Sequence, residues 1–322
     1  MHKNVLVTGG AGYIGSHTCL ELKKNGFTPI VFDNMSTGHK DFVKWGPLEI
    51  GDLKSKADLK RLFNNFDIKY VIHIAGKANV QESISNPVKY FEENIHGTTN
   101  LLNQFIRSKG DIFIFSSSCA TYGNSNKGKI KESQTQLPIN PYGFTKLASE
   151  NLIKYLGESL KFKFSILRYF NVAGASENLE IGELHLDETH VIPLLINSYL
   201  KKEIFTIFGN DFPTKDGTAI RDYLHVADLA KAHISALKYN LTTGNNITCN
   251  IGTGNGVSVL QLVNEIKKFD PNFKFEFKEK RSGDPAALVA DVTMSKILDW
   301  VPLQSNISTI INSALSWHKT FL

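Results

Sequence analysis

The 322-residue sequence contains no run of about 18 consecutive apolar residues, the length from which a membrane-spanning helix is recognised. Its first 15 residues become glycine-rich after only four or five apolar positions, unlike the longer apolar region of a secretory signal peptide. We therefore expect a soluble, cytoplasmic protein that makes no contact with a membrane.

Cysteine is scarce, and charge of one sign is barely in excess. The three cysteines, Cys19, Cys119 and Cys249, are far apart and form neither the close pairs of a zinc site nor a disulfide framework. We expect three reduced thiols and no bound metal. The 36 Lys and Arg exceed the 31 Asp and Glu by only 5, which is too few to indicate a nucleic-acid partner.

Hydrophobic residues make up 42% of the sequence, enough for a large core, and they fall into short β-branched runs separated by longer helical stretches. The strand runs are continuously apolar, as in a parallel sheet that helices cover on both faces. We predict an α/β fold with a doubly wound parallel sheet. The expected strands are 5–8, 29–33, 70–76, 112–118 and 161–170, and the expected helices are 15–25, 87–109 and 142–160.

The regular alternation stops after residue 171, where residues 174–189 have a polar, loop-like composition. Residues 223–237 and 247–252 again have helix and strand patterns that fit the main sheet, whereas 273–281 alternates at period two and favours a half-exposed strand over a basic recognition patch. We predict one domain at 1–172, with segments at about 219–253 returning to it, and a smaller C-terminal lobe at 173–218 and 254–322.

A glycine-rich turn, TGGAGYIGSH at residues 8–17, follows the first strand and precedes a helix. Glycine permits the tight turn and the close approach of a pyrophosphate, whose charge meets free N–H groups at the helix N-terminus. Two registers fit, because Gly12 and Gly15 can be combined with either Gly9 or Gly10. The context predicts a dinucleotide site in a Rossmann domain.

Asp33 ends the second strand, 18 residues beyond Gly15, near the spacing expected for a carboxylate that accepts hydrogen bonds from the adenosine ribose. This carboxylate would repel a 2′-phosphate, and no Lys or Arg stands at 34–38 to neutralise one. We therefore predict NAD as the cofactor and not NADP.

Tyr142 and Lys146 are four residues apart at the start of an expected helix, so their side chains project from one face. Ser118 ends a strand, and ligands of open α/β sheets bind outside the carboxyl ends of the strands. A tyrosine of pKa about 10 is a poor base at neutral pH. We expect Lys146 and the positive nicotinamide ring together to stabilise its phenolate.

The chain as a whole resembles the extended short-chain dehydrogenase/reductase family, and within it the nucleotide-sugar 4-epimerases. The resemblance implies an NAD-dependent isomerase of galactose metabolism, which interconverts UDP-glucose and UDP-galactose at C4 through a transient 4-keto sugar. It also implies a homodimer formed through helices within 87–109 and 142–160. The matching blocks, in the same order, are GGAGYIGSH, FDNMSTGH, HIAG, FSSSCATYG, PYGFTK, LRYFNVAGA, IFGNDFPTKDGTAIRDYLHV and RSGDPAALVAD.

The same resemblance implies a role for each matching position. Tyr142 resembles the catalytic base, Lys146 its partner that also holds the nicotinamide ribose, and Ser118 the hydroxyl that binds the reacting oxygen. The cofactor positions are Gly9, Gly12, Tyr13, Ile14, Gly15, Asp33, Asn34, Ser36, Asp52, Leu53, Ile74, Ala75, Gly76, Asn94 and Phe170 with Tyr142 and Lys146, and the UDP-sugar positions are Ser118, Asn171, Thr206, Phe208, Arg221, Arg281, Asp284 and Leu288.

The sequence departs from the family pattern at two positions and leaves alternatives open. Ala78 stands where many members have Lys, and Ala120 stands where many have Thr, so the substrate contact of that hydroxyl is either absent or replaced by Thr121. The preferred sugar stays open, because a UDP-N-acetylhexosamine or UDP-pentose 4-epimerase would share these blocks. Two further alternatives are a 4,6-dehydratase, which needs an acid and a base where Cys119 and Ala120 stand, and a non-catalytic NAD-binding regulator.

Overall fold

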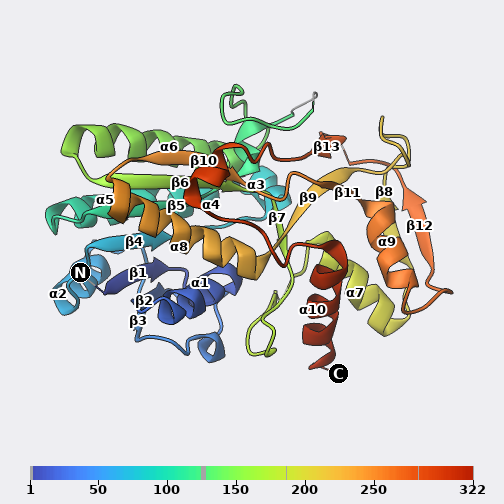
Figure 1. Ribbon diagram of the computed structural model, residues 1–322, viewed down its shortest axis with the longest axis horizontal. Coiled ribbons are helices and arrows are strands. Elements are labelled where there is room, and N and C mark those ends of the chain that lie inside the picture. The colour runs from blue at the N-terminus through green and yellow to red at the C-terminus, as the bar shows by residue number, and fades with distance from the viewer. Residues whose placement is uncertain (1–2, 125–127, 186, 282, 322) are drawn as a thin grey trace.

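A seven-stranded parallel sheet forms the larger part of the molecule in a computed structural model that describes residues 3–124, 128–185, 187–281 and 283–321 (Figure 1). The sheet confirms the predicted fold class. The strands are β1 (Asn4–Thr8), β2 (Thr28–Asp33), β3 (Leu48–Ile50), β4 (Tyr70–His73), β5 (Ile112–Ser118), β6 (Lys163–Tyr169) and β10 (Ile247–Ile251), in the spatial order β10-β6-β5-β4-β1-β2-β3.

Alternate residues of each central strand enter two different cores, as expected for a sheet covered on both faces. Val5 and Val7 pack with α1 (Tyr13–Lys24) and α8 (Val226–Thr243), whereas Leu6 between them packs on the opposite face. That second face is covered by α2 (Lys56–Asn65), α5 (Gly97–Arg107) and α6 (Pro141–Leu160). Because successive side chains of a strand enter cores on opposite faces of the sheet, both sets are apolar. The strands therefore do not alternate between apolar and polar residues.

The helix expected at 87–109 is divided. It consists of α4 (Pro87–Tyr90), a π-helical segment at Phe91–His96 and α5, preceded by the short α3 (Val80–Ser85). Two segments expected to return to the main sheet do so, because α8 packs against α1 and β10 pairs with β6. The strand β9 (Ile220–His225), which directly precedes α8, instead belongs to the smaller lobe.

The smaller lobe surrounds a third hydrophobic core. In it, β9 pairs with β7 (Asn171–Ala173), β11 (Gly256–Ser258) and β13 (Ala287–Leu288), and β8 (Phe205–Phe208) pairs with β12 (Phe275–Lys278). The half-exposed strand expected at 273–281 is β12. The helices of this lobe are α7 (Val191–Lys201), α9 (Val259–Lys267) and α10 (Ile307–Lys319).

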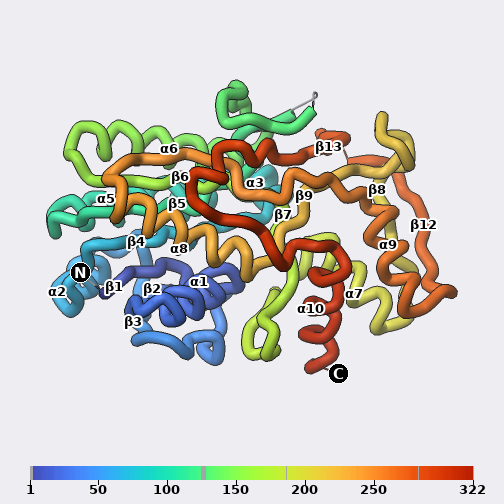
Figure 2. Tube along the Cα trace, viewed as in Figure 1, coloured from blue at the N-terminus to red at the C-terminus, as the bar shows by residue number. Residues whose placement is uncertain are grey.

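The chain after β13 ties the two parts together. It runs back across α8 before it enters α10, as the red tube shows (Figure 2). Trp300 Nε1 donates a hydrogen bond of 2.8 Å to the carbonyl of Asp228, and Ser305 Oγ donates one of 2.7 Å to the Asp228 carboxylate. The two lobes are therefore joined by buried polar contacts as well as by the peptide chain.

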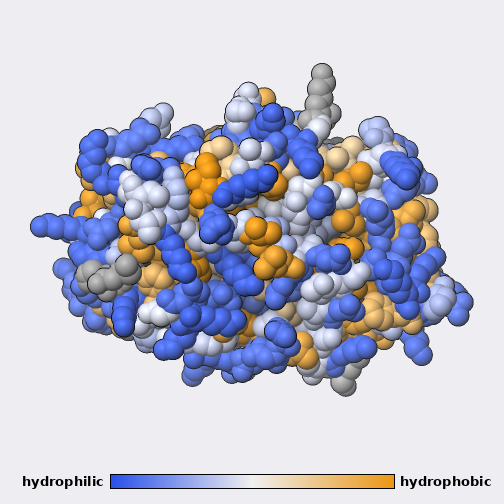
Figure 3. All heavy atoms as spheres, in the orientation of Figure 1, coloured by the Kyte–Doolittle hydropathy of each residue, from blue (hydrophilic) through white to orange (hydrophobic). Residues whose placement is uncertain are grey.

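The surface is mixed in character. Hydrophilic side chains cover most of the face in Figure 3, and the apolar ones gather in separate patches. Within the described residues, the helices all fall short of the length and apolar character that crossing a membrane requires.

Candidate active site

The structure of the glycine turn between β1 and α1 decides whether Gly9 or Gly10 combines with Gly12 and Gly15 at the cofactor site. Gly9, Gly12 and Gly15 line a cavity at the carboxyl edge of the sheet, whereas a Cβ at Gly10 would meet the side chain of Val31 at 2.9 Å. Gly9 has a φ of +69°, and a Cβ at Gly15 would lie 2.0 Å from the Gly9 carbonyl oxygen. Only glycine therefore fits the turn, and the N-terminus of α1 opens into the cavity.

This first cavity brings together most of the residues expected at the cofactor. They come from the ends of β1, β2, β3 and β4 and from the first two turns of α1 and α6. The expected residues that line it are Gly9, Gly12, Tyr13, Ile14, Gly15, Asp33, Asn34, Ser36, Asp52, Leu53, Ile74, Ala75, Gly76, Tyr142 and Lys146.

The two remaining cofactor candidates lie elsewhere. Asn94 is buried behind the cavity wall, where its Oδ1 accepts a hydrogen bond of 2.8 Å from Lys77 N and its Nδ2 donates to Thr145 Oγ1 at 3.0 Å. It holds the loop after Gly76 against α6. Phe170 lines the second cavity described below.

Asp33 is fixed at the end of β2. Its Oδ2 accepts a hydrogen bond of 3.0 Å from Ala11 N and its Oδ1 accepts one of 2.9 Å from Met35 N. Burial raises the pKa of the carboxyl, and these two backbone bonds oppose the rise. Each oxygen keeps a further acceptor position for a hydroxyl group in the cavity.

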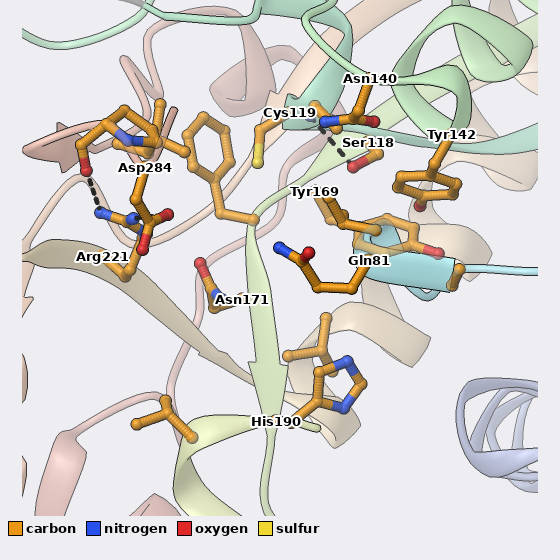
Figure 4. A pocket seen from close by; sticks show the side chains of 18 of the residues that line it. Gln81, Ser118, Cys119, Asn140, Tyr142, Tyr169, Asn171, His190, Arg221 and Asp284 are labelled. Carbon is orange, nitrogen blue, oxygen red and sulfur yellow. Dashed lines mark hydrogen bonds and ion pairs between the residues drawn. The ribbon is translucent and has the colours of Figure 1, made fainter. Parts of the chain in front are cut away.

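The Ser-Tyr-Lys group predicted from the sequence is assembled beside the same cavity. Ser118 is the last residue of β5, and Tyr142 lies in the first turn of α6, where Asn140 Oδ1 caps the helix by accepting a bond of 2.8 Å from Gly143 N. The Tyr142 and Ser118 side chains lie next to each other in Figure 4, and Ser118 lowers the pKa of the Tyr142 phenol. Lys146 Nζ, one helical turn further on, donates a bond of 2.8 Å to the Ser116 carbonyl.

Burial dominates the electrostatics of the protein's own residues in this group. Burial raises the pKa of Tyr142 to about 12, and the neighbouring Ser118 only partly offsets this rise. Burial also lowers the pKa of Lys146 to about 8, against the opposing effect of Glu150. The lysine ammonium is directed to a backbone carbonyl, so within the protein chain desolvation of the phenolate outweighs any help from Lys146.

A second cavity adjoins the first at Tyr142 and extends into the smaller lobe. The expected substrate residues that line it are Ser118, Asn171, Arg221, Arg281, Asp284 and Leu288. Arg221 stands at the end opposite Tyr142 (Figure 4), where its guanidinium donates 3.0 Å to Asp284 Oδ1 and 2.8 Å to the Pro285 carbonyl.

Thr206 and Phe208 are not among the residues that line this cavity. Thr206 Oγ1 donates a bond of 3.0 Å to Glu276 Oε1 on the neighbouring β12, and Phe208 lies under the Arg281 guanidinium, whose carbon is 4.2 Å from the ring centroid. Phe208 therefore supports Arg281, which lines the cavity. Thr206 instead bonds to the neighbouring strand β12.

Several lining residues were not singled out from the sequence. Tyr169 and His190 line both cavities, and Gln81 lines the second one. Tyr169 directly follows the buried Arg168 on β6, and nothing in the sequence around Tyr169 indicated a chemical role. His190 ends the stretch Glu183-x-His-x-x-Glu-x-His190, whose spacing was a recognisable signal inside a segment interpreted only as a polar loop.

The buried histidines agree with a packing role, whereas Cys119 is only partly buried and lines the second cavity. Burial raises the pKa of Cys119 to about 12, which disfavours the thiolate. His73 is buried between Thr8 Oγ1 at 2.7 Å and Thr98 Oγ1 at 2.8 Å, and His233 Nε2 lies 2.7 Å from Ser116 Oγ. These rings hold neighbouring strands and helices together.

A doubly wound sheet with this glycine turn, Asp33 and the Ser-Tyr-Lys group defines a dinucleotide-binding α/β enzyme of the Rossmann type. Residues 5–252 match the model of the NAD dependent epimerase/dehydratase family, and the chain belongs to that family.

Relatives and solved structures resemble the chain along nearly its whole length. A protein of Rhizobium meliloti named UDP-glucose 4-epimerase is 43% identical over 321 residues, which is 99% of this chain and 98% of the relative. The UDP-glucose 4-epimerase of Brucella ovis in complex with NAD is 40% identical with a TM-score of 0.93, covering 98% of each chain. The UDP-Glc/GlcNAc 4-epimerase of Campylobacter jejuni is 36% identical with a TM-score of 0.86, covering 99% of each chain.

Proposed function

We propose that this protein is a UDP-glucose 4-epimerase, which interconverts UDP-glucose and UDP-galactose. The observation that carries the proposal is the position of Tyr142 and Ser118 at the junction of two cavities. One cavity has the glycine turn and Asp33 of a dinucleotide site, and the other has two arginines suited to a diphosphate. The names of the relatives support the same activity.

The residues of the first cavity fit NAD. The turn leaves no room for a Cβ at Gly15, and α1 has no acidic residue in its first turn to repel a pyrophosphate. Asp33 and the lack of a basic residue at 34–38 favour an unphosphorylated ribose. When bound, NAD supplies a hydride acceptor for C4 of the sugar and then a donor that returns the hydride to the opposite face.

The protein's own residues manage the proton and the oxygen at C4. Tyr142 takes the proton of the 4-hydroxyl and later gives it back, while Ser118 Oγ hydrogen-bonds the same oxygen. Lys146 keeps a positive charge one helical turn from the phenol and presents it to the cofactor cavity. Because burial disfavours the phenolate, this charge and that of the cofactor have to offset the desolvation.

The arginines hold the diphosphate while the hexose turns. Arg221 is fixed by Asp284 and by the Pro285 carbonyl, and Arg281 rests on the ring of Phe208. Rigid placement at the nucleotide end reduces the ordering cost of binding and leaves the sugar end free to rotate. We assign Asn171 and Leu288, which also line the cavity, to the sugar side.

We propose that the protein acts as a cytoplasmic homodimer through α4, the π-helical segment and α6. Five apolar side chains are exposed on these elements: Val88 at 67%, Phe91 at 41%, Phe144 at 48%, Tyr155 at 73% and Leu160 at 51%. The Phe91 and Phe144 rings stack with centroids 5.7 Å apart, so the elements present a joint apolar surface. Sedimentation equilibrium should give twice the chain mass of 35.9 kDa.

A second candidate is a 4-epimerase with a broader range of sugars. Leu288 has an intermediate size at the sugar side, and a similar structure belongs to a UDP-Glc/GlcNAc 4-epimerase. A 4,6-dehydratase is disfavoured because Cys119 and Ala120 offer no acid and base. A non-catalytic regulator is disfavoured because Ser118, Tyr142 and Lys146 are assembled.

Incubation of the purified protein with UDP-glucose, UDP-N-acetylglucosamine and UDP-xylose in turn, with products identified by NMR, tests the proposal. We expect UDP-galactose from UDP-glucose, and no product with Tyr142→Phe at the same protein concentration. A product that has lost water would indicate a dehydratase. Bound cofactor without turnover of any sugar would indicate a regulator and overturn the proposed activity.

A further inference from the structure

A cluster of two histidines and two glutamates lies where the two cavities meet, outside the Ser-Tyr-Lys group. Its members are Glu183, His185, Glu188 and His190, which come from a single loop between β7 and α7. His190 lines both cavities, His185 lines the first and Glu183 the second (Figure 4 labels His190). The proposed epimerisation uses none of these four side chains.

The ligand atoms of the cluster converge on one point. One nitrogen or oxygen from each side chain lies within 4.8 Å of the others. His185 Nδ1 is 3.2 Å from a Glu188 oxygen and 3.6 Å from Glu183 Oε1, while His190 Nδ1 is 2.5 Å from Glu183 Oε1 and 3.7 Å from Glu188 Oε1. Ligands about 2.0 Å from a tetrahedral zinc ion are about 3.3 Å from one another, so these separations bracket the required spacing.

The surroundings hold the ligands in place. The backbone N–H groups of Thr189 and His190 each donate a bond of 2.7 Å to Glu188 Oε1, and Trp317 Nε1 donates one of 2.8 Å to the Glu183 carbonyl. Such outer contacts orient the ligands of metal sites. His39 Nε2 lies 2.9 Å from the Leu184 carbonyl and attaches the loop to the first domain.

The cluster also gathers two carboxylates in a partly buried place. Glu183 is 3% exposed, and two carboxylates face each other across the cluster. Among the ion pairs of the described residues, those of Glu183 and Glu188 are made with His185 and His190 alone. A divalent ion competes with the imidazole protons for these four side chains, and when it displaces them its charge balances the two carboxylates.

We propose that Glu183, His185, Glu188 and His190 bind one divalent transition-metal ion of the zinc class. The ion joins residues 183–185 to residues 187–190 beside the two cavities. His190 Nδ1 and Glu183 Oε1 separate slightly to admit it, which the half-exposed ring of His190 allows. This site differs from the sequence expectation of no metal, which considered cysteine ligands only, and it does not depend on which sugar the enzyme takes.

Titration of untagged, EDTA-treated full-length protein with Co²⁺ and Zn²⁺ tests the site. We expect one bound ion per chain by mass-spectrometric metal analysis, and the intense visible absorption of four-coordinate Co²⁺ that Zn²⁺ then displaces. His185→Gln and Glu188→Gln change partly exposed ligands and should weaken binding at least tenfold. Glu183→Gln should do the same if it folds.

Two matched variants serve as controls, because Glu180→Gln and His96→Gln change the same residue types outside the cluster. They should bind as tightly as the unmodified protein. Absence of a one-to-one complex, or binding unchanged in both His185→Gln and Glu188→Gln, overturns the proposal. Because the readout is metal content and absorption, neither result depends on epimerase activity.

Discussion

Arg168 and Glu150 form a buried ion pair between β6 and α6. Arg168 Nη2 lies 2.6 Å from Glu150 Oε2, Arg168 Nε lies 2.9 Å from Glu150 Oε1, and the side chains are 2% and 0% exposed. Glu150 is one helical turn beyond Lys146, which is one turn beyond Tyr142. The pair therefore fixes the helix that carries the proposed catalytic residues against the strand that carries Tyr169.

We predict that Arg168→Met lowers the free energy of unfolding by about 3 to 5 kcal/mol, because it leaves the Glu150 carboxylate buried without its partner. Urea denaturation followed by circular dichroism measures the loss. Lys268→Met, in the exposed pair with Glu265, is the control and should cost less than about 1 kcal/mol. Equal losses in both variants would show that burial of the pair is unimportant.

Tyr142→Phe should keep the fold and the bound NAD but lower turnover at least about 100-fold. A positioned group that transfers a proton typically contributes 10² to 10⁴ in rate. Steady-state rates with UDP-glucose, compared at equal content of bound cofactor, provide the measurement. A rate near that of the unmodified enzyme would remove Tyr142 from the mechanism.

Lys146→Met should shift the ascending limb of the pH-rate profile to higher pH. The base acts in its deprotonated form, and a nearby ammonium lowers the pKa of a phenol, so removing the ammonium raises that pKa. The pKa of Lys146 is lowered to about 8, so most of the side chain is charged at neutral pH. Turnover should therefore fall more at pH 7 than at pH 9.

This comparison requires variant protein with normal cofactor content, because Lys146 also lines the cofactor cavity. An unchanged profile in such protein would mean that another group sets the pKa of the base.

Denatured protein should release NAD or NADH and not the 2′-phosphorylated forms. Asp33 is held by two backbone bonds with its carboxylate in the first cavity, where it repels a 2′-phosphate. Chromatography of the released nucleotide against the four standards decides the question. Recovery of mainly NADP would contradict the assignment of Asp33 to the ribose.

Leu288→Ser should improve kcat/KM for UDP-N-acetylglucosamine relative to UDP-glucose. Leu288 lies on β13 opposite Arg221 of β9 and lines the second cavity. Forcing an acetamido group against a packed side chain costs about 1 to 3 kcal/mol, or about 5- to 150-fold in kcat/KM. We therefore expect UDP-glucose and UDP-galactose to be the good substrates of the unmodified enzyme.

Competition of the two sugars in one reaction gives the ratio of kcat/KM directly. Equal values in the unmodified protein, or no relative gain in Leu288→Ser, would count against Leu288 as the residue that limits the size of the 2-substituent.

The sequence by itself determined the fold class and the features that are local along the chain. The apolar runs at 5–8, 29–33 and 112–118 became central parallel strands, because continuous apolar runs fit only a sheet that is covered on both faces. The glycine turn was equally local, since a Cβ is excluded by backbone within six residues of Gly15. Asp33 followed from its fixed distance after that turn.

Tertiary structure decided which distant residues share a cavity. Asn94 and Thr206 match a pattern in the chain, yet Asn94 packs behind the cavity wall and Thr206 bonds across to β12. Burial decided the electrostatics as well, because the high pKa of Tyr142 arises from desolvation by segments far away in the sequence. The Glu183 to His190 cluster converges only once the loop is folded against Trp317 and His39, which no local pattern of hydrophobicity encodes.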